Sequence, residues 1–385
     1  MRQWKRIKIE DIGSLSNGIN FDKSSYVAGA KLIGVSDFKD RLYPDYDNLQ
    51  QVSIDAVKEG DYLKKGDIVF VRSNGNKNLV GRCMIIDKNL PVTYSGFCIR
   101  LRIKDTAKYN PLFFAYLFKS TDFRNSMANN AVGANIQNLN QKRLGGYEPL
   151  VPDYRTQLHI ASILSKYDTL IENYQQQIKL LEEAAQRLYK EWFVDLHFPG
   201  YENTKIVDGV PEGWEKTVLS KIAEFRRGKT VVKKEITVGS IPVVAGGLTP
   251  AYYFNKANTE NRVITISGSG ANAGFTKLYY QRVWASDCSF VDTSMTEHLY
   301  FVYCFMKANK INIDNLQKGA AQPHVYAKDI NNLQIIIPDH NILSQFEAKV
   351  ANAFERIAIL KSQLRLLTEA RDRLLPKLMS GEIEV

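Results

Sequence analysis

Apolar residues recur at alternating steps of four and three along residues 346–378. Such spacing is typical of a coiled-coil helix. Only Arg371 is polar among these positions. A proline disfavours helix at the preceding residue, so the helix should begin just after Pro338-Asp339, and Pro376 should kink or end it near Leu375. The apolar positions are Phe346, Val350, Ala353, Ile357, Leu360, Leu364, Leu367, Leu374 and Leu378.

A second stretch, residues 160–192, shows the same spacing with one extra step of four between Tyr174 and Ile178. Such a stutter relaxes the supercoil locally. We expect the two helices to bury their seams on each other within one molecule. Pairing between two copies, which would give a dimer, and two core helices of a globular domain are the alternatives. The predicted seam consists of Ile160, Ile163, Tyr167, Leu170, Tyr174, Ile178, Leu181, Leu188, Phe346, Val350, Ile357, Leu360, Leu364, Leu367 and Leu374.

The chain also repeats itself. The segment QIKLLEEAAQRL (177–188) returns as QLRLLTEARDRL (363–374), 186 positions later. At the same offset Gly133 matches Gly319, and Pro152-Asp153 matches Pro338-Asp339. Near the start of each copy, Trp4, Ile12 and Gly18 match Trp214, Ile222 and Gly228 at an offset of 210. The first copy therefore holds roughly two dozen extra residues, best placed within 36–67.

The segments outside the long helices contain short β-rich runs that end in turn residues, at 66–73 and 261–270. Closing strands are expected at 147–153 and 333–339, and a buried helix at 110–127 and 294–309. The predicted fold class is α+β: two similar mixed domains, each followed by a long helix, with an internal repeat. The domain limits are 1–152 and 199–338, with helical regions at 153–198 and 339–385.

Charge is distributed unevenly along the 385 residues, whose net charge is +10. Residues 1–150 hold 23 Lys and Arg against 15 Asp and Glu, and residues 201–336 hold 16 against 12. The segments that carry the long helices are neutral or slightly acidic. A basic surplus in the two domains suits a polyanion such as nucleic acid. A soluble basic protein without such a partner fits the charge equally well.

Other classes of protein find little support. No apolar stretch approaches the length of a membrane helix, and the basic N-terminus lacks the apolar core of a signal peptide. The four scattered cysteines form no C-x-x-C pair, which fits buried thiols in a reducing cytoplasm. The five histidines are not spaced as metal ligands, so no metal site is expected.

Catalytic motifs are incomplete. In RRGKT (226–230) the first glycine of a phosphate loop is replaced by Ala223, and GSGANAG (268–274) has its third glycine one residue too late for a dinucleotide fingerprint. The chain has no Pro-Pro, which excludes the adenine-methyltransferase motif, and no acidic-lysine pair can be placed after a Pro-Asp as in a nuclease. We predict that the chain is not an enzyme.

Several loops of the two basic domains combine glycine with amides and cations. Asn and Gln can contact adenine edges, Arg and Lys can contact guanine or phosphate, and glycine permits close approach of the backbone. Ordinary turn chemistry explains any single residue as well. The predicted DNA-binding residues are Asn17, Asn20, Lys23, Arg72, Ser73, Asn74, Asn76, Lys77, Asn78, Arg82, Asn135, Gln137, Asn138, Lys142, Arg226, Arg227, Lys229, Lys233, Ser267, Ser269, Asn272, Gln322, His324 and Lys328.

With these residues in view, the whole chain resembles the specificity (S) subunit of type I restriction–modification enzymes. The resemblance rests on VPEGWEKTVLSKIAEF (210–225), on the helix IASILSKYDTLIENYQQQIKLLEEAAQRLYKEWFVD (160–195), and on EARDRLLPKLMSGEIEV (369–385), whose LLPKLMSGEI is highly specific. It implies two target-recognition domains, each reading half of a split DNA site. It also implies that the helices pair antiparallel and set the gap.

The resemblance further implies partners: double-stranded DNA, two methyltransferase (M) subunits and restriction (R) subunits, in the cytoplasm and without a membrane. S-adenosylmethionine would belong to the M subunits and ATP with Mg²⁺ to the R subunits, so this chain would bind no cofactor. A nuclease or methyltransferase acting alone, and a coiled-coil scaffold without DNA contact, remain the alternatives. Where the second copy has Gln322, the first has Ile136, with Gln137 one place later, which puts equivalent contacts there in doubt.

Overall fold

The computed structural model describes residues 4–39, 41–74, 79–128, 137–231, 237, 239–319 and 322–385. The chain forms two compact units. Unit 1 contains residues Met1–Asn173 and Leu364–Val385, and unit 2 contains residues Tyr174–Gln363.

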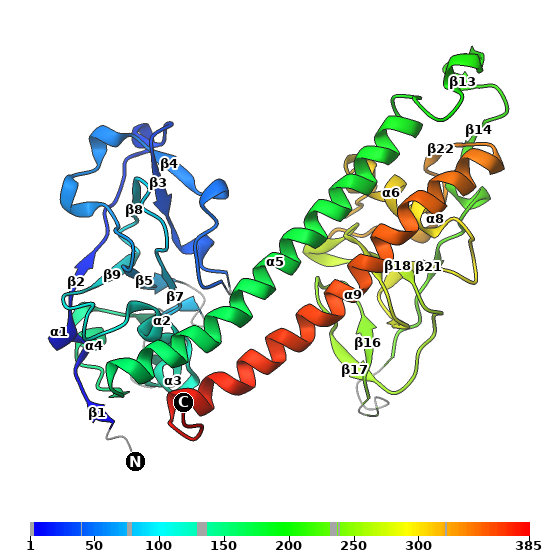
Figure 1. Ribbon diagram of the computed structural model, residues 1–385. Helices are drawn as coiled ribbons and strands as arrows, with labels where there is room; N and C mark the ends of the chain where they lie inside the picture. The colour runs from blue at the N-terminus through cyan, green and yellow to red at the C-terminus, as the bar shows by residue number, and fades with distance from the viewer. Residues whose placement is uncertain are drawn as a thin grey trace. The chain divides into compact units, whose positions relative to one another are not determined.

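Two forty-residue helices, α5 (Tyr154–Phe193) and α9 (His340–Met379), contribute to both units (Figure 1). Each begins directly after a Pro-Asp pair, as predicted. The Asp153 carboxylate accepts a hydrogen bond from the backbone N–H of Thr156 (3.0 Å), and that of Asp339 accepts one from Ile342 (3.1 Å). These carboxylates cap the free N–H groups of the first turn, which explains the repeated Pro-Asp.

The helices run antiparallel. In unit 2, Glu182 of α5 pairs with Lys361 of α9 (2.9 Å), and further along α5 the ring of Trp192 lies 6.0 Å from that of Phe346. In unit 1, Asp168 of α5 pairs with Arg371 of α9 (2.6 Å). The intramolecular antiparallel coiled coil is thus confirmed.

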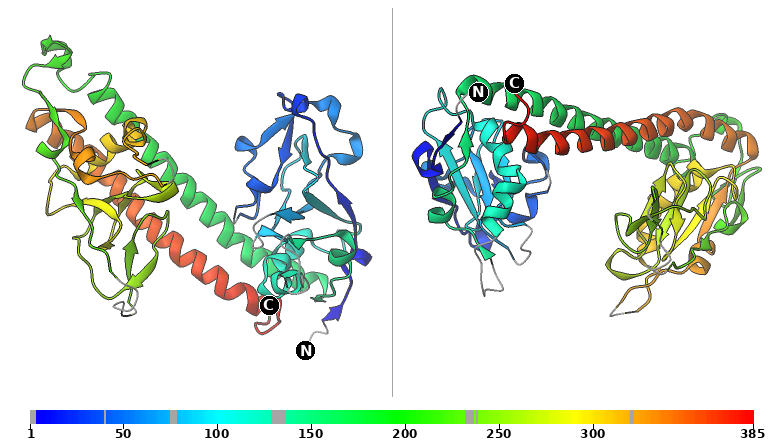
Figure 2. Two further views of the ribbon diagram at one scale, coloured as in Figure 1. Left: turned by 180° about the vertical axis from the view of Figure 1, so that it is seen from behind. Right: turned by 90° about the horizontal axis from the view of Figure 1, so that it is seen from below.

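Unit 1 contains a four-stranded antiparallel sheet in the order β2-β9-β5-β7 and a three-stranded sheet in the order β4-β3-β8, in which β3 and β8 are parallel. Figure 2 shows these sheets on one side of the helices. The strands are β2 (Gly13–Asn17), β3 (Ala30–Ile33), β4 (Gln50–Val52), β5 (Ile68–Val71), β7 (Cys83–Ile85), β8 (Val92–Tyr94) and β9 (Cys98–Ile103). Two short pairs join β1 (Lys5–Arg6) to β11 (Leu150–Val151) and β6 (Ser73–Asn74) to β10 (Gln137–Asn138). The helices are α1 (Ile9–Ile12), α2 (Pro111–Lys119), α3 (Thr121–Ala128) and α4 (Gln141–Gly145).

Unit 2 repeats this topology. Its four-stranded sheet has the order β15-β21-β18-β19, and in its three-stranded sheet β17-β16-β20 the strands β16 and β20 are again parallel. The strands are β15 (Arg226–Arg227), β16 (Ile241–Val244), β17 (Tyr252–Phe254), β18 (Val263–Ser267), β19 (Thr276–Tyr279), β20 (Trp284–Ala285) and β21 (Cys288–Asp292). Two further pairs join β12 (Ile206–Val207) to β13 (Val210–Pro211) and β14 (Glu215–Val218) to β22 (Gln334–Ile337). The helices are α6 (Leu299–Ala308), α7 (Lys310–Asp314) and α8 (Ala327–Asn331). The α+β class and the internal repeat are confirmed.

Apolar helices form the core of each unit, as their sequences require. In unit 1, Phe114 and Phe118 of α2 are fully buried, and Phe118 meets Phe70 of β5 edge-on at 4.9 Å. In unit 2, Phe301 of α6 lies 4.9 Å from Phe193 at the end of α5. Each buried phenylalanine contributes roughly 1.5–3 kcal/mol, so these contacts hold α2 against the sheet of unit 1 and α6 against α5 in unit 2.

Residues 36–67, predicted to hold the extra length of the first copy, lie between β3 and β5. They form β4 and short 3-10 turns at Val35–Asp37, Tyr46–Asn48, Ile54–Ala56 and Glu59–Asp61. Phe38, Tyr46 and Leu49 bury themselves in a second apolar cluster with Val69 and Met84. The stretch is therefore part of the packed unit.

The predicted seam is wrong at Leu170 in the first half of α5. Leu170 is 43% exposed, whereas its neighbour Ile171 is 7% exposed. The buried positions repeat every seven residues without a stutter, at Leu164, Ile171, Ile178, Ala185 and Trp192, joined by Ala161, Asp168 and Tyr189. The physical reason is that polar residues occupy the second row at this point: Asp168 is buried, and one and two heptads later Gln175 is exposed and Glu182 is half-buried. The pattern of apolar residues alone therefore favoured the neighbouring positions.

The remaining predicted seam residues are either buried or half-buried. Ile160, Phe346, Val350, Ile357 and Leu360 are buried, while Ile163, Tyr167, Tyr174, Leu181, Leu188, Leu364, Leu367 and Leu374 are half-buried. Pro376 does not end α9, which continues to Met379. Proline has a helical φ and removes only one donor, and the fully buried Leu378 holds the last turn in the core of unit 1.

Candidate nucleic-acid interface

Two polar loops of unit 1 meet at β6 and β10. The backbone of Asn74 pairs with that of Gln137, and Ser73 with Asn138. Next to this pair, the half-buried Arg72 donates its backbone N–H to Phe97 (2.8 Å) and its guanidinium to the carbonyl of Gly96 (3.5 Å). Two loops whose paired residues are 63 and 65 positions apart in sequence thus share one edge with the β8–β9 turn.

The end of β2 joins the same edge. Gly18 donates to the carbonyl of Cys98 (3.1 Å), and Gly96 donates to that of Ile19 (2.7 Å). A Cβ at Gly18 would lie 2.2 Å from the Ser95 carbonyl, so only glycine permits this approach. The exposed Asn17 and Asn20 therefore stand beside the turn. Phe97 is 57% exposed at its tip.

The other cations of unit 1 are spread more widely. Lys23 is exposed in a 3-10 turn (Lys23–Ser25), and Lys142 is exposed on α4. Arg82 is half-buried and donates to the carbonyl of Phe38 (3.4 Å), so this guanidinium is turned into the unit. Its predicted role as a DNA contact loses support.

In unit 2 the corresponding edge carries an ionic network. Asp287 accepts a hydrogen bond from the Ser269 hydroxyl and pairs with the Arg227 guanidinium (3.4 Å). Arg226 and Lys229 are exposed on either side. Gly228 donates to the carbonyl of Cys288 (2.8 Å), as Gly18 does to Cys98 in unit 1.

His324 completes this edge. Its backbone forms isolated bridges with Ser269 and Lys318, and its ring is parallel to that of the exposed Tyr326 at 6.0 Å. Gln322 is exposed next to it, and Lys328 is exposed on α8. Five predicted residues, Arg226, Arg227, Lys229, Ser269 and His324, thus lie on strands and turns that are paired with one another.

Ser267 is the clearest correction. It is buried, and its hydroxyl donates to the carbonyl of Gly246 (3.0 Å), so it supports the turn and is not available to DNA. Asn272 is half-buried in the neighbouring 3-10 turn. The predicted residues Asn76, Lys77, Asn78, Asn135 and Lys233 lie outside the described residues.

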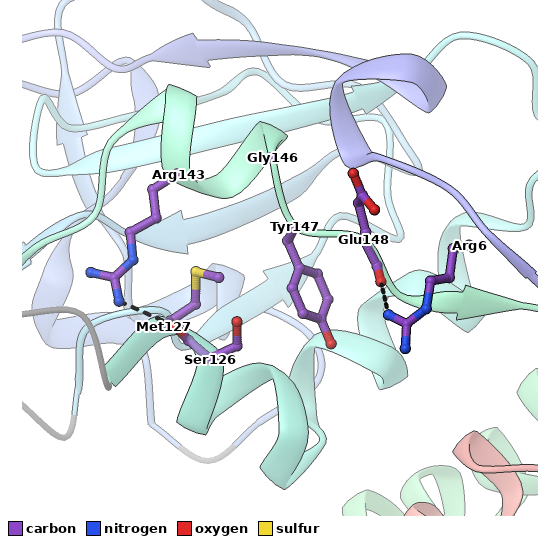
Figure 3. Close-up of a pocket in the computed structure, with 7 residues that line it drawn as sticks. All are labelled: Arg6, Ser126, Met127, Arg143, Gly146, Tyr147 and Glu148. Carbon is purple, nitrogen blue, oxygen red and sulfur yellow. Dashed lines mark hydrogen bonds between the residues drawn. The ribbon is translucent and has the colours of Figure 1, made fainter.

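A separate hollow in unit 1 is lined by Arg6, Ser126, Met127, Arg143, Gly146, Tyr147 and Glu148 (Figure 3). Arg143 donates to the carbonyl of Ser126 (3.2 Å), and Arg6 donates to that of Glu148 (3.2 Å). Burial lowers the pKa of Arg143 and raises that of Tyr147. Both arginines donate to backbone carbonyls, so the contacts around the hollow join α4 to α3 and β1 to the segment that contains Glu148.

The described ranges contain neither a cluster of metal-ligating side chains nor a membrane-spanning helix. Within them, no three His, Cys, Asp or Glu side chains gather as metal ligands, and no helix is both long and apolar enough to cross a membrane. The four cysteines are free and buried. Burial raises the pKa of the Cys83 thiol to about 11 and that of Cys98 to about 12, which keeps both unreactive at neutral pH.

Comparison with known proteins decides the family. The model of the type I restriction modification DNA specificity domain matches residues 1–183 and 211–366. The chain belongs to the type I restriction–modification specificity subunits. It is 29% identical to the MjaIX specificity subunit of Methanocaldococcus jannaschii, over all of this chain and 94% of that one, and 24% identical to the HindI specificity subunit of Haemophilus influenzae over the full length of both. The crystal structure of an S subunit from M. genitalium shows the same fold, with a TM-score of 0.66, 18% identity and coverage of 98% and 96%.

Membership in this family confirms the resemblance found in the sequence. A specificity subunit is the non-catalytic, DNA-recognising component of a type I system, so the prediction that the chain is not an enzyme is confirmed. The two matched ranges correspond to the two copies of the repeat.

Phe97 and Asp287, which were not predicted from the sequence, occupy equivalent places in the two units. Asn17 pairs across the sheet with Ile99, one residue after Cys98, and Arg227 pairs with Ser289, one residue after Cys288. The residue before each cysteine is therefore equivalent as well: Phe97 in unit 1 and Asp287 in unit 2. Aligning YSGFC with WASDC on the cysteine would have pointed to both residues.

Proposed function

We propose that this specificity subunit reads a bipartite DNA site, one half with each recognition domain, while the helix pair fixes the gap. Residues 1–152 and 199–338 would form the recognition domains, and residues 153–198 and 339–385 the spacer. The observation that carries the proposal is that two units of one topology present different polar side chains at equivalent strand ends.

The difference between the two edges supports direct reading of bases. Unit 1 presents amides and an exposed aromatic ring, at Asn17, Asn20 and Phe97, whereas unit 2 presents Arg226, Arg227 and Lys229. Amides suit adenine, arginine suits guanine, and an apolar ring suits the thymine methyl group. Half-sites of different sequence follow from this chemistry.

The outer faces of α5 and α9 support two identical protein partners. Leu180 and its repeat equivalent Leu366 are each 53% exposed. Around them the repeat retains an ion pair at the same spacing, Lys179–Glu183 in one helix and Arg365–Glu369 in the other, both at 3.9 Å. The face is completed by Ala184 and Arg187 on α5 and by Ala370 and Arg373 on α9.

Packing within a unit does not require identity at exposed positions, so the retained face indicates one kind of partner bound twice. We assign it to two M subunits, which would carry S-adenosylmethionine, with R subunits supplying ATP and Mg²⁺. Leu180→Glu or Leu366→Glu should reduce the number of M subunits bound from two to one, and the double variant should abolish binding, as measured by light scattering. Leu158→Glu, exposed but outside this face, is the control.

Genome-wide mapping of methylated adenines tests DNA recognition. Cells that express the chain with its methyltransferase should methylate a single motif with two defined halves and a constant gap. A continuous motif, or methylation that does not depend on this chain, would contradict the proposal. The cytoplasmic location expected from the cysteines stays a prediction.

A further inference from the structure

The repeat places two pairs of residues at equivalent positions of the helix pair. At the offset of 186, Asp168 of α5 corresponds to Phe354 of α9, and Ala185 of α5 corresponds to Arg371 of α9. The place along the helix pair where Asp168 meets Arg371 in unit 1 therefore corresponds to the place of Phe354 and Ala185 in unit 2. We call each of these places a level of the helix pair. The two levels differ completely in chemistry.

In unit 1 this level is a buried ionic network. The Asp168 carboxylate is 5% exposed and accepts hydrogen bonds from Arg371 (2.6 Å) and from the Tyr116 hydroxyl of α2 (2.6 Å). Burial lowers the pKa of Arg371, but the hydrogen bonds and charges of Asp168 and, after it, Asp372 outweigh burial and leave the pKa above its ordinary value. The buried Asp168 carboxylate keeps its cationic partner only while α5 and α9 face each other, whereas the half-buried Arg371 also pairs with Asp372 of its own helix (2.8 Å).

In unit 2 the same level is apolar. Phe354 is 1% exposed and stacks on Tyr300 at 4.4 Å, with Tyr303 edge-on at 5.8 Å. Ala185 is buried on α5. Neither residue could neutralise a charge placed opposite it.

This asymmetry matters because α5 and α9 are similar enough to pair with their own copies in a second molecule. In an antiparallel pair of two α9 helices, Arg371 of one copy would face Phe354 of the other. In a pair of two α5 helices, Asp168 would face Ala185. A buried charge without its partner is strongly destabilising, and polar groups at single seam positions are known to select coiled-coil partners.

We propose that the Asp168–Arg371 pair makes the two helices of this chain complementary to each other and rejects pairing with the helices of a second copy. The Glu182–Lys361 pair acts in the same sense, since the repeat equivalents of these residues are Thr368 and Gln175. That pair is more than a third exposed, so its contribution is smaller. The proposal concerns helix pairing and is independent of DNA recognition.

Lysine crosslinking of the full chain can detect the rejected arrangement. Lys349 and Lys377 are 28 residues apart on α9, about 42 Å along a continuous helix, beyond the span of a short crosslinker. In an antiparallel pair of two α9 helices, Lys349 of one copy would face Lys377 of the other. A crosslink between these residues therefore reports pairing of α9 with α9.

The variant Asp168→Phe/Arg371→Ala gives unit 1 the chemistry of unit 2. After unfolding and refolding, it should yield the Lys349–Lys377 crosslink about tenfold or more above the wild-type level, together with dimers in light scattering. The control Asp168→Arg/Arg371→Asp keeps an ion pair with exchanged partners and should remain at the wild-type level. Circular dichroism checks that each variant refolds.

A second variant keeps the test decisive if the first does not refold. Asp168→Asn/Arg371→Leu removes both charges and keeps side chains of similar size, so it should produce the same crosslink. Absence of the crosslink in every variant that refolds would overturn the proposal. An equally strong crosslink in the wild-type chain would overturn it as well.

Discussion

The turn after β8 in unit 1 and the turn after β20 in unit 2 occupy the same place in the same topology, yet they carry opposite chemistry. Phe97 exposes an apolar ring, whereas Asp287 anchors Arg227 and Ser269. The glycines that bring the neighbouring strand close, Gly18 and Gly228, are retained in both. The comparison teaches that the backbone of the edge is common to both units and the side chains on it are free to vary.

The two units also differ in how they cap the first turn of their buried helix, α2 in unit 1 and α6 in unit 2. The first turn of α2 is capped by Asn110, whose side chain accepts from Phe113 (3.0 Å), and Asn110 in turn donates to Gln157 of α5 (2.8 Å). The first turn of α6 is capped instead by Glu347 of α9, which accepts from Phe301 (2.7 Å). The neutral amide cap in unit 1 and the ionisable carboxyl cap in unit 2 should respond differently to pH.

The largest effect is expected from removing the aromatic level of unit 2. Phe354→Ala should lower the free energy of unfolding of unit 2 by about 3–5 kcal/mol, because it leaves a cavity beside Tyr300. Hydrogen exchange measured by mass spectrometry should show faster exchange in α6 with little change in α2. Equal loss of protection in both helices would show that the two levels are not independent.

The next largest effect is expected from Glu347, which caps α6, as a change of stability with pH. Burial raises the pKa of Glu347 to about 7, from an ordinary value near 4.5. The folded state therefore holds its proton more tightly than the unfolded state, and stability falls as pH rises from about 4.5 to 7, by up to about 3 kcal/mol. Glu347→Gln retains an acceptor for Phe301 and should remove this fall. Protection of α6 measured from pH 5 to 8 would test it, and an unchanged pH dependence would refute the assignment.

A smaller effect is expected at the edge of unit 2. Arg227→Ala should weaken recognition of one half-site by about 1–3 kcal/mol, as expected for loss of one bidentate base contact. The other half-site should be methylated as before. Lys216→Ala, an exposed cation on β14, is the matched control. Relaxation of both half-sites would contradict separate reading by the two units.

The smallest effect is expected at Phe97. Phe97→Ala should relax one base of the other half-site, by about 1 kcal/mol, and leave the salt dependence of binding unchanged, since the ring contacts no phosphate. Lys23→Ala is the opposite case: it should reduce the salt slope without changing sequence preference. Fluorescence binding titrations at several salt concentrations separate the two. A Phe97→Ala variant with wild-type preference at every base would exclude the ring from recognition.

Much of this architecture could be predicted from the sequence because strong periodic signals carry it. The apolar row of α9 and the repeat offset identified both helices, and Pro-Asp marked where each begins. Leu170 was mispredicted as a seam residue because Asp168 is buried by an ion pair with a residue 203 positions away, which no local pattern reveals. Phe97 and Asp287 were missed for a similar reason: an exposed ring and a lone carboxylate become informative only when the strands place them beside Asn17 and Arg227.

Lengthening the spacer tests the central claim most directly. Duplicating residues 172–178 in α5 and the equivalent 358–364 in α9 adds one heptad to each helix and keeps the outer face with Leu180 and Leu366 intact. Seven residues add about 10 Å, which corresponds to roughly three base pairs of duplex. Methylation mapping should then show both half-sites unchanged and the gap lengthened by about three base pairs. A variant that folds, binds M subunits and methylates at the wild-type gap would contradict the account.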